Sequence, residues 1–424
     1  MKNKQITLKE YRYLFVGDKN EGKNKAVDKQ TFDELEAFVL KNSDTVQFLK
    51  VGQNKYHKFI QAQNYVGVIQ TKNGTTIEIL PKIQNVNDQR SKEILIRMLK
   101  TLKKSPFKHF NMAHLKSAKM PLLEIFISMF LEELSKLIQK GIKSDYITKE
   151  ENLKYLKGKL KINDQIKRNY IHKERFFVEY QEFLSDRVEN RLIKTTLEYL
   201  YKKSRSNRNQ QRIREFLFVF DEISSCRDIK TGFSKVKLDR QMKDYEQVLL
   251  WCKTFLLENS FSPYKGKDVA FALLFDMNLL FESYVYDYLK RHGNFESITA
   301  QDKSHHLAYQ ENKGRFRLKP DIVINDGAII ADTKWKILSE DKTHQGVSQD
   351  DMYQLYAYGT KYEKCKDMYL IYPLDRIDKK EGRHYRYFKD ETCISNQGLS
   401  LKVLFFDVSQ DFKSYDFELL AYNK

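Results

Sequence analysis

The sequence has few cysteines and no long uncharged apolar run. Its 424 residues include four cysteines, Cys226, Cys252, Cys365 and Cys393, which form no CxxC pair. This spacing argues against a zinc or iron–sulfur site and against a disulfide framework. No stretch approaches 18 uncharged apolar residues, so no membrane-spanning helix is expected. The first residues, MKNKQITLKEYRYLFVG, lack the apolar core and cleavage site of a signal peptide, so a cytoplasmic protein is expected.

Two other patterns that would indicate a bound cofactor are incomplete. The nine histidines are scattered, and the adjacent pair His305 and His306 lacks the helical spacing of metal ligands. The segment GDKNEGKN, residues 17–24, fits the GxxxxGK pattern of a phosphate-binding loop, but Asn24 stands where a hydroxyl must reach Mg²⁺. We therefore expect residues 17–24 to form a polar loop and expect no nucleotide to bind to this chain.

Positive charge is what the sequence has in excess. The net charge is +18, and 13% aromatic content argues against global disorder. A field of this sign favours polyanions, chiefly nucleic acid, although a solvated lysine-rich surface would give the same number. Residues 101–120 and 201–214 are acid-free and basic, so they are candidates for phosphate contacts or solvated helix ends. Residues 153–170 interleave lysine with apolar residues, which fits either a partner-docking hairpin or a DNA track.

The pattern along the chain predicts an α/β protein of the multi-domain α+β kind. Residues 1–90 are β-rich, with a hairpin expected around Asn73-Gly74 and one helix near 31–42. Residues 91–264 are mainly helical. The clearest helices are expected at 121–141, 187–200 and 243–257.

Residues 265–424 mix helices and strands, which predicts a mixed sheet flanked by helices. A long helix is expected over residues 268–293, and a short one over 349–358, beginning after Ser348 with Asp351 three residues on as a capping pair. The expected strands are 305–310, 315–325, 328–337, DMYLIYP and LKVLFFDV.

Two acids interrupt an otherwise apolar pair of strands. In KPDIVINDGAIIADTKWK, residues 319–336, the Asp326-Gly327 pair predicts a turn between two strands. Asp332 and Lys334 then share one face about 6–7 Å apart, because side chains alternate along a strand. The turn returns Asp321 to their side. Carboxylates this close repel each other and tend to take up a proton, whereas a divalent cation such as Mg²⁺ removes the repulsion.

Three more polar side chains are expected near these acids. Glu282 belongs to an apolar stripe of the expected long helix, so it should point inward and complete the metal shell directly or through water. The members of this stripe are Phe275, Leu279, Glu282, Tyr286 and Leu289. Gln354 and Tyr358 stand one helical turn apart and are expected to contact a phosphate or to hold Lys334.

These residues resemble the motifs of a known nuclease family. Pro320-Asp321 followed by Asp332-Thr333-Lys334 is similar to the PD-(D/E)xK nuclease motif, and Gln354 through Tyr358 resembles the QxxxY element of its RecB-like branch. Further segments resemble the McrC subunit of McrBC-type restriction systems, including the related LlaJI-type nuclease subunits. They are VGVIQ…TIEILPKI (66–83), YLKGKL (155–160) and DRVENRLIK (186–194). The resemblance covers most of the chain.

The resemblance implies a Mg²⁺-dependent endonuclease acting on double-stranded DNA, with Mn²⁺ as an alternative metal. Carried over to this chain, Asp321 and Asp332 are metal ligands, the carbonyl of Thr333 is a third, and Glu282 adds to the shell. Lys334 orients the attacking water or stabilises the pentacovalent phosphate. The fold implied for residues 265–424 is the restriction-endonuclease-like mixed sheet.

The resemblance also implies a partner, a hexameric McrB-like AAA+ GTPase that binds the GTP. Residues 1–90 are then the docking region, and residues 1 to about 260 together stimulate the partner. Two other functions fit the sequence: a non-cleaving activator of the partner, and a stand-alone RecB-like repair nuclease.

Each site residue also has a structural interpretation. Asp321 and Asp332 fit a buried ion pair with Lys334. Glu282 fits a salt bridge to a lysine. Gln354 and Tyr358 fit simple helix packing.

Overall fold

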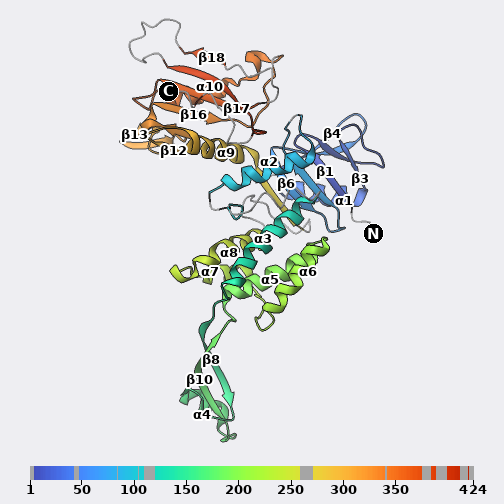
Figure 1. Cartoon of the computed structure of the whole chain (residues 1–424), viewed down its shortest axis with the longest axis vertical. Helices are drawn as coiled ribbons and strands as arrows, with labels where there is room; N and C mark the ends of the chain where they lie inside the picture. Colours follow the sequence, from blue (N-terminus) through green and yellow to red (C-terminus); the bar gives the residue numbers. More distant parts are fainter. Residues whose placement is uncertain are drawn as a thin grey trace. The chain divides into compact units, whose positions relative to one another are not determined.

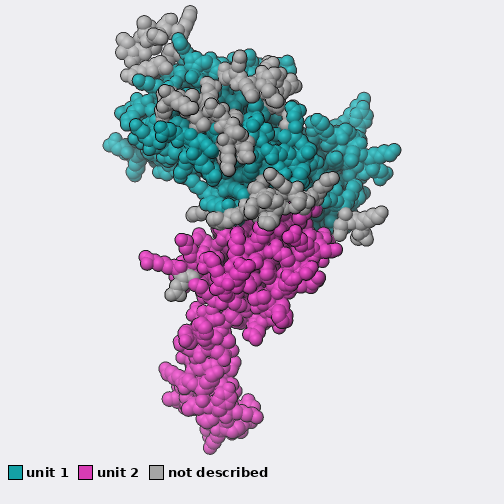
Figure 2. All heavy atoms as spheres, viewed as in Figure 1, with its two compact units in different colours: residues 1–117, 261–424 teal, residues 118–260 magenta. Residues whose placement is uncertain are grey.

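The computed structural model describes most of the chain. It describes residues 4–42, 47–83, 85–103, 105–108, 120–257, 271–339, 341–374, 383–387, 399–410 and 419. These residues form two compact units, which Figure 2 colours separately. One unit is residues 118–260, and the other joins residues 1–117 to residues 261–424. No helix within the described ranges is long and apolar enough to cross a membrane.

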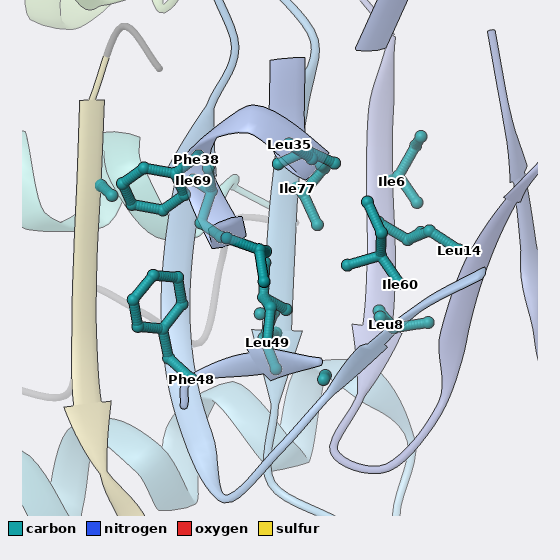
Figure 3. Packing of buried hydrophobic residues seen from close by; sticks show 14 of the residues in the cluster. Ile6, Leu8, Leu14, Leu35, Phe38, Phe48, Leu49, Ile60, Ile69 and Ile77 are labelled. Atoms are coloured by element: carbon teal, nitrogen blue, oxygen red, sulfur yellow. The ribbon is translucent and has the colours of Figure 1, made fainter. Parts of the chain in front are cut away.

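The first unit begins with two four-stranded sheets, of order β1-β7-β6-β11 and β3-β2-β5-β4. Their elements are β1 (Gln5–Lys9), β2 (Tyr13–Val16), β3 (Lys25–Val27), α1 (Lys29–Asn42), β4 (Leu49–Gln53), β5 (Lys58–Ala62), β6 (Tyr65–Gln70), β7 (Thr76–Leu80) and β11 (Phe271–Asp276). Apolar side chains from both sheets and from α1 share one core, part of which Figure 3 shows. The expected helix, the hairpin at Asn73-Gly74 and the polar loop at residues 17–24 are all confirmed.

Strand β11 corrects the helix expected over residues 268–293. Phe271–Asp276 is a strand that pairs with β6, and the helix α9 (Met277–His292) begins only after it. An apolar run of this length has no periodicity that separates a buried strand from a buried helix, so the partner strand decides. A Cβ on Gly67, which has φ 141°, would lie 2.0 Å from the carbonyl oxygen of Leu273. Glycine at this position is therefore what lets β6 approach β11.

The second unit combines a helical bundle with a small sheet. Its helices are α3 (Leu122–Gln139), α4 (Ile162–Asn169), α5 (Val188–Lys203), α6 (Asn207–Val219), α7 (Ile229–Lys235) and α8 (Lys243–Leu256), and a 3₁₀ turn covers Arg240–Met242. Helices α3, α5 and α8 confirm the three helices expected for the middle of the chain. The sheet has the order β8-β10-β9, with β8 (Asp145–Leu153), β9 (Lys159–Leu160) and β10 (Phe176–Leu184), and α4 packs against β10.

The C-terminal part of the first unit is a six-stranded mixed sheet of order β12-β15-β16-β17-β19-β18. Its strands are β12 (Ile298–Ala300), β15 (Ile322–Ile324), β16 (Ile329–Thr333), β17 (Asp367–Pro373), β18 (Arg383–Arg386) and β19 (Ser400–Phe406). Helix α10 (Gln349–Gly359) packs against the sheet face that carries Ile330. Helix α9 also packs against β16, and its Phe281 ring contacts the ring of Trp335. β16 therefore lies in the middle of the sheet between two helices (Figure 1).

Helix α2 (Asp88–Thr101) links the two ends of the chain within the first unit. It packs against both β7 and α9, and Arg97 donates to the carbonyl oxygen of Gln410 at 3.0 Å. These contacts explain why residues 1–117 and 261–424 form one unit. The expected regions 1–90 and 265–424 fall within it, and their boundaries remain predictions. The expected multi-domain α+β fold is confirmed.

Candidate functional site

The strands β15 and β16 bring the two acids of the KPDIVINDGAIIADTKWK segment together. They pair antiparallel, with Ile322 opposite Ala331 and Ile324 opposite Ile329. The turn between them lies at Asn325–Gly327, where Asp326 has φ 52° and Gly327 has φ 96°. The predicted Asp-Gly turn is thus confirmed, and it is what returns the chain so that Asp321 and β16 face each other.

Asp321 is held by the strand that carries the second acid. Its Oδ2 atom accepts hydrogen bonds from both the backbone N–H and the side-chain hydroxyl of Thr333, each at 2.8 Å. These bonds use one carboxylate oxygen of Asp321. Because the Thr333 hydroxyl is occupied in this way, the Thr333 group that remains suited to a cation is its backbone carbonyl.

Asp332 and Lys334 form an ion pair on the same strand. The Lys334 Nζ atom lies 2.6 Å from Asp332 Oδ2, and the backbone N–H of Lys334 donates to Ile371 at 2.9 Å, which extends the pairing of β16 with β17. Asp332 is 2% exposed. Among the described residues, its Oδ2 atom has no partner with hydrogen-bond geometry besides this charge contact.

Helix α10 orients the lysine through a chain of hydrogen bonds. Lys334 Nζ donates to Gln354 Oε1 at 3.1 Å, and Gln354 Nε2 donates to the Tyr358 hydroxyl at 2.7 Å. That hydroxyl donates to the carbonyl oxygen of Lys319 at 3.2 Å. Of the two roles expected for Gln354 and Tyr358, this geometry matches holding Lys334 in place.

Glu282 reaches the site from α9, although not as a member of the expected stripe. The buried residues of α9 are Met277, Leu280, Phe281, Tyr284, Val285, Tyr288 and Leu289, whereas Leu279 is 42% exposed. This helix has apolar side chains around most of its circumference, so spacing alone indicated the wrong face. Packing against the sheet and α2 selects the buried face, which leaves Glu282 half-buried at its margin.

The three carboxyl groups share one electrostatic environment. Burial, reinforced by the charge of Glu282, raises the pKa of Asp321 to about 6. Burial and the charge of Asp321 raise the pKa of Asp332 to about 7, against the opposing effect of Lys334. Burial also raises the pKa of Glu282, with a contribution from Asp332 and an opposing one from Lys319. Burial alone would lower the pKa of Lys334, but Asp332 outweighs it and raises that pKa.

This arrangement fits a divalent cation with oxygen ligands. Two mutually repelling carboxyl groups with free lone pairs are what such a cation would stabilise. Within the described ranges, no three Asp, Glu, His or Cys side chains are grouped so as to hold a metal unaided. A cation here would therefore bind Asp321 and Asp332 and take its other ligands from the Thr333 carbonyl, water or a phosphate. Mg²⁺ usually keeps several waters and binds through one or two carboxylates.

Sequence reasoning missed a fourth acid, Asp351. Its Oδ1 atom lies 3.6 Å from Lys334 Nζ, and its Oδ2 atom accepts from the hydroxyl of Tyr372 at 3.3 Å. Helix α10 does begin after Ser348, as predicted, but the Ser348 side chain makes no capping hydrogen bond. Asp351 stands three residues before Gln354 and so faces the same way, a helical spacing that would have indicated its place beside Lys334.

A buried acid connects the N-terminal sheet to this site. Glu10 follows β1, and its carboxylate accepts bonds from the indole N–H of Trp335 at 3.1 and 3.0 Å and from the backbone N–H of Lys82 at 3.0 Å. Trp335 is the next residue after Lys334. Burial raises the pKa of Glu10 to about 7, although the charge of Lys82 opposes this shift.

Glu10 should make the stability of the protein depend on pH. Because the folded state raises the pKa of Glu10 from 4.5 to about 7, the free energy of unfolding is expected to fall as the pH rises through this range. The change in the free energy of unfolding that this one group causes is on the order of 3 kcal/mol.

Glu10→Gln keeps an acceptor for Trp335 and should remove that pH-dependent change. Urea unfolding at pH 5 and pH 8 measures the difference, with the exposed Glu296→Gln as the control. Equal pH dependence in all three proteins would contradict the assignment.

The basic stretches of the sequence separate into structural and exposed groups. Arg212 donates to the carbonyl oxygen of Leu131 at 3.2 Å, which is a structural role. Lys202, Arg205 and Arg208 are exposed. Most of the stretch 101–120 lies outside the described residues, so its expected phosphate contacts remain a prediction.

Comparison with known proteins gives one family and a shared fold. A family model described as McrBC 5-methylcytosine restriction system component matches residues 60–373. No curated protein matches the chain. One similar structure is the refined half-complex from the tetradecameric assembly of Thermococcus gammatolerans McrB AAA+ hexamers with bound McrC. A chain of it has 20% sequence identity and a TM-score of 0.68, and the match covers 98% of this chain and 97% of that chain. Another is the cryo-EM structure of the Thermococcus gammatolerans McrBC complex, one chain of which has 22% sequence identity and a TM-score of 0.52. That match covers 68% of this chain and 88% of that chain.

Proposed function

Because the chain belongs to the family of McrBC 5-methylcytosine restriction system components, we propose that it is the DNA-cleaving subunit of a two-component restriction complex. The McrBC family expected from the sequence is thereby confirmed, whereas the McrC-like role and the PD-(D/E)xK domain are part of this proposal. The activity is inferred from the site, which supports a metal-dependent endonuclease of the PD-(D/E)xK type.

The observation that carries the proposal is the surplus of acid around one lysine. Lys334 lies 2.6 Å from Asp332 and 3.6 Å from Asp351, while Asp321 lies close enough to raise the pKa of Asp332. A structural ion pair needs one acid for one base. Additional carboxylates largely removed from water destabilise a protein without a cation, so the presence of Asp321 and Asp351 beside the buried Asp332 supports a role in binding one.

The residues of this chain would divide the work as follows. Asp321, Asp332 and the Thr333 carbonyl hold Mg²⁺ or Mn²⁺, and Glu282 contributes through water. The bound metal supplies positive charge for the developing oxyanion and lowers the pKa of the attacking water. Lys334 orients that water or donates to a phosphate oxygen.

Helix α10 completes this division of labour. Gln354 holds the Lys334 ammonium, and Tyr358 holds Gln354. Lys334 is thereby kept in one position before DNA arrives, and such pre-organisation favours the transition state.

The second component we propose is a hexameric McrB-like AAA+ GTPase, which would bind the GTP. One structure that shares this fold contains McrB AAA+ hexamers with bound McrC. A group of exposed apolar side chains on α4, in the turn between β8 and β9 and just after α4 supports a protein contact, because soluble proteins rarely expose large apolar patches. We call it the tip cluster; its members are Tyr155, Leu156, Ile162, Ile166, Tyr170 and Ile171. For residues 153–170, this exposure favours partner docking over a DNA track.

Incubation of plasmid DNA with the chain, Mg²⁺ and GTP tests the proposal, with and without the AAA+ protein. Methylated and unmethylated plasmids are both used. Cleavage that needs both proteins would support the two-component nuclease. Stimulated GTP hydrolysis without cleavage would instead indicate a non-cleaving activator. Equal cleavage by the chain alone would indicate a stand-alone repair nuclease.

Lys334→Ala should lose cleavage while keeping the metal. The ammonium is expected to act on water or phosphate, and removing one such group costs about 100-fold in rate. Because Lys334 repels a cation, its removal should leave Mn²⁺ binding intact or stronger, as measured by calorimetry. Loss of Mn²⁺ binding in a folded Lys334→Ala protein would point to a structural ion pair instead.

A further inference from the structure

A two-stranded hairpin next to the site projects unpaired positive charge. Within the described ranges, strands β13 (His306–Gln310) and β14 (Lys313–Arg317) pair only with each other and belong to no larger sheet. Apart from the half-buried His306, every residue of both strands is exposed. Isolated hairpins of this kind are marginally stable in water and usually gain stability by packing on something else. Figure 1 labels β13 beside β12.

The charge of this hairpin is mainly positive. Lys313, Arg315 and Arg317 lie along β14, and Lys319 follows them, whereas the one acid of the hairpin is Glu311 in its turn. Among the described residues, no carboxylate forms an ion pair with Lys313, Arg315 or Arg317. A row of unpaired cations on an exposed strand is suited to the phosphates of a nucleic acid.

The same hairpin carries two exposed aromatic residues, Tyr309 on β13 and Phe316 on β14. Phe316 is 76% exposed and Tyr309 is 66% exposed. Phe316 also has φ 53°, a left-handed conformation that aromatic residues rarely adopt. Residues with strained backbone conformations cluster at active sites, ligand clamps and switch regions.

The dimensions and position of the hairpin suit a DNA groove beside the cleavage site. Glu311 and Asn312 both have positive φ, 50° and 62°, which makes the tight two-residue turn of a narrow ribbon. Strands of five residues extend about 17 Å. The major groove of B-DNA is about 12 Å wide and admits a two-stranded β-ribbon.

The base of the hairpin is tied to the candidate metal site. The backbone N–H of Leu318 donates to the carbonyl of His305 at 2.9 Å, which closes the hairpin, and Leu318 is buried in the core under α10. Asp321 follows Arg317 by four residues, so their Cα atoms lie within about 14 Å of each other. That distance spans about four base-pair steps of a duplex.

We propose that the β13–β14 hairpin enters the major groove of duplex DNA next to the scissile phosphate, with Lys313 and Arg315 on the backbone and Phe316 against the bases. This inference rests on the proposed function, because it takes DNA as the substrate. Lys313 and Arg315 would set the position of the duplex. Phe316 would add contact that does not depend on charge.

The test uses the full chain carrying Asp332→Asn, so that DNA is bound but not cut. A fluorescent 30-base-pair duplex is titrated at several salt concentrations. Lys313→Ala with Arg315→Ala should weaken binding about tenfold and reduce the slope of log K against log salt by about 2. Phe316→Gly should weaken binding without changing that slope.

The control is the exposed pair Lys19→Ala with Lys23→Ala, which removes the same charge from the 17–24 loop and should change neither the affinity nor the slope. Methyl green, which occupies the major groove, should compete more strongly than netropsin, which occupies the minor groove.

The outcomes separate this inference from the function beneath it. If the parent binds the duplex and the hairpin variants bind like the control pair, the hairpin proposal is wrong and the nuclease proposal stands. If the hairpin variants bind DNA normally but stimulate the AAA+ partner less, the hairpin contacts protein. If the parent binds no duplex even at low salt, both proposals fail.

Discussion

Asp332→Asn is expected to abolish DNA cleavage, with a loss of about 1000-fold or more in rate. Asparagine has nearly the shape of aspartate but lacks the negative charge that we propose holds Mg²⁺. Asp332 is 2% exposed and lies 2.6 Å from Lys334, so this change would remove the proposed ligand without opening a cavity. The measurement is plasmid cleavage with Mg²⁺, GTP and the AAA+ partner, together with Mn²⁺ binding by calorimetry.

Asp326→Asn is a matched control for this experiment. It makes the same chemical change in the exposed turn between β15 and β16, where asparagine tolerates the observed φ of 52°. It should cleave like the parent protein. Cleavage at the parental rate by folded Asp332→Asn protein would show that the metal assignment is wrong.

Replacing two members of the tip cluster is expected to uncouple the chain from its partner. Tyr170 is 78% exposed and Ile171 is 84% exposed, so Tyr170→Ser with Ile171→Ser should leave the fold intact. If these side chains fill a pocket on the AAA+ protein, their loss should weaken binding by about 30-fold or more. The concentration of chain that half-maximally stimulates GTP hydrolysis measures this change.

Phe218→Ser with Val219→Ser provides the comparison within the same unit. These neighbours at the end of α6 are 83% and 42% exposed, so the change also removes exposed apolar surface. It should leave the half-maximal concentration unchanged. Equal effects of the two double variants, or none from the tip variant, would contradict docking through the tip cluster.

Residues 1 to about 260, the region expected to stimulate the partner, are not a self-contained part of the fold, because residues 1–117 form one unit with residues 261–424. A fragment ending at residue 260 would lack β11, which pairs with β6 along six residues of the N-terminal sheet. Its loss would expose the edge of that sheet and part of the core beneath it. The boundaries of the compact unit 118–260 do not divide a sheet. Substitutions in the full chain nevertheless avoid the question of whether a fragment folds.

Much of the candidate site was predictable because its geometry is local. Side-chain alternation in a strand places Asp332 and Lys334 on one face, and an Asp-Gly turn brings Asp321 back to them. One helical turn separates Gln354 from Tyr358, and the structure shows the resulting hydrogen bond at 2.7 Å. These relations depend on residues within about a dozen positions of each other in each case.

The sequence by itself therefore determined the turn at Asp326-Gly327, several of the strands, most of the helices and the acids that belong together. The single strand expected over residues 315–325 is wrong, because the structure has two strands there, β14 and β15, in different sheets. Only the tertiary structure decided that residues 271–276 form a strand, which face of α9 is buried, and that Asp351 faces Lys334 rather than capping a helix. It also decided that the β13–β14 hairpin stands exposed and joins no larger sheet formed by the residues that the structure describes. The physical reason is the same in each case. An apolar run can form a strand or a helix, and an acid on a helix can cap that helix or pair with a base. Residues that are distant in the sequence and become neighbours only after folding decide between these alternatives.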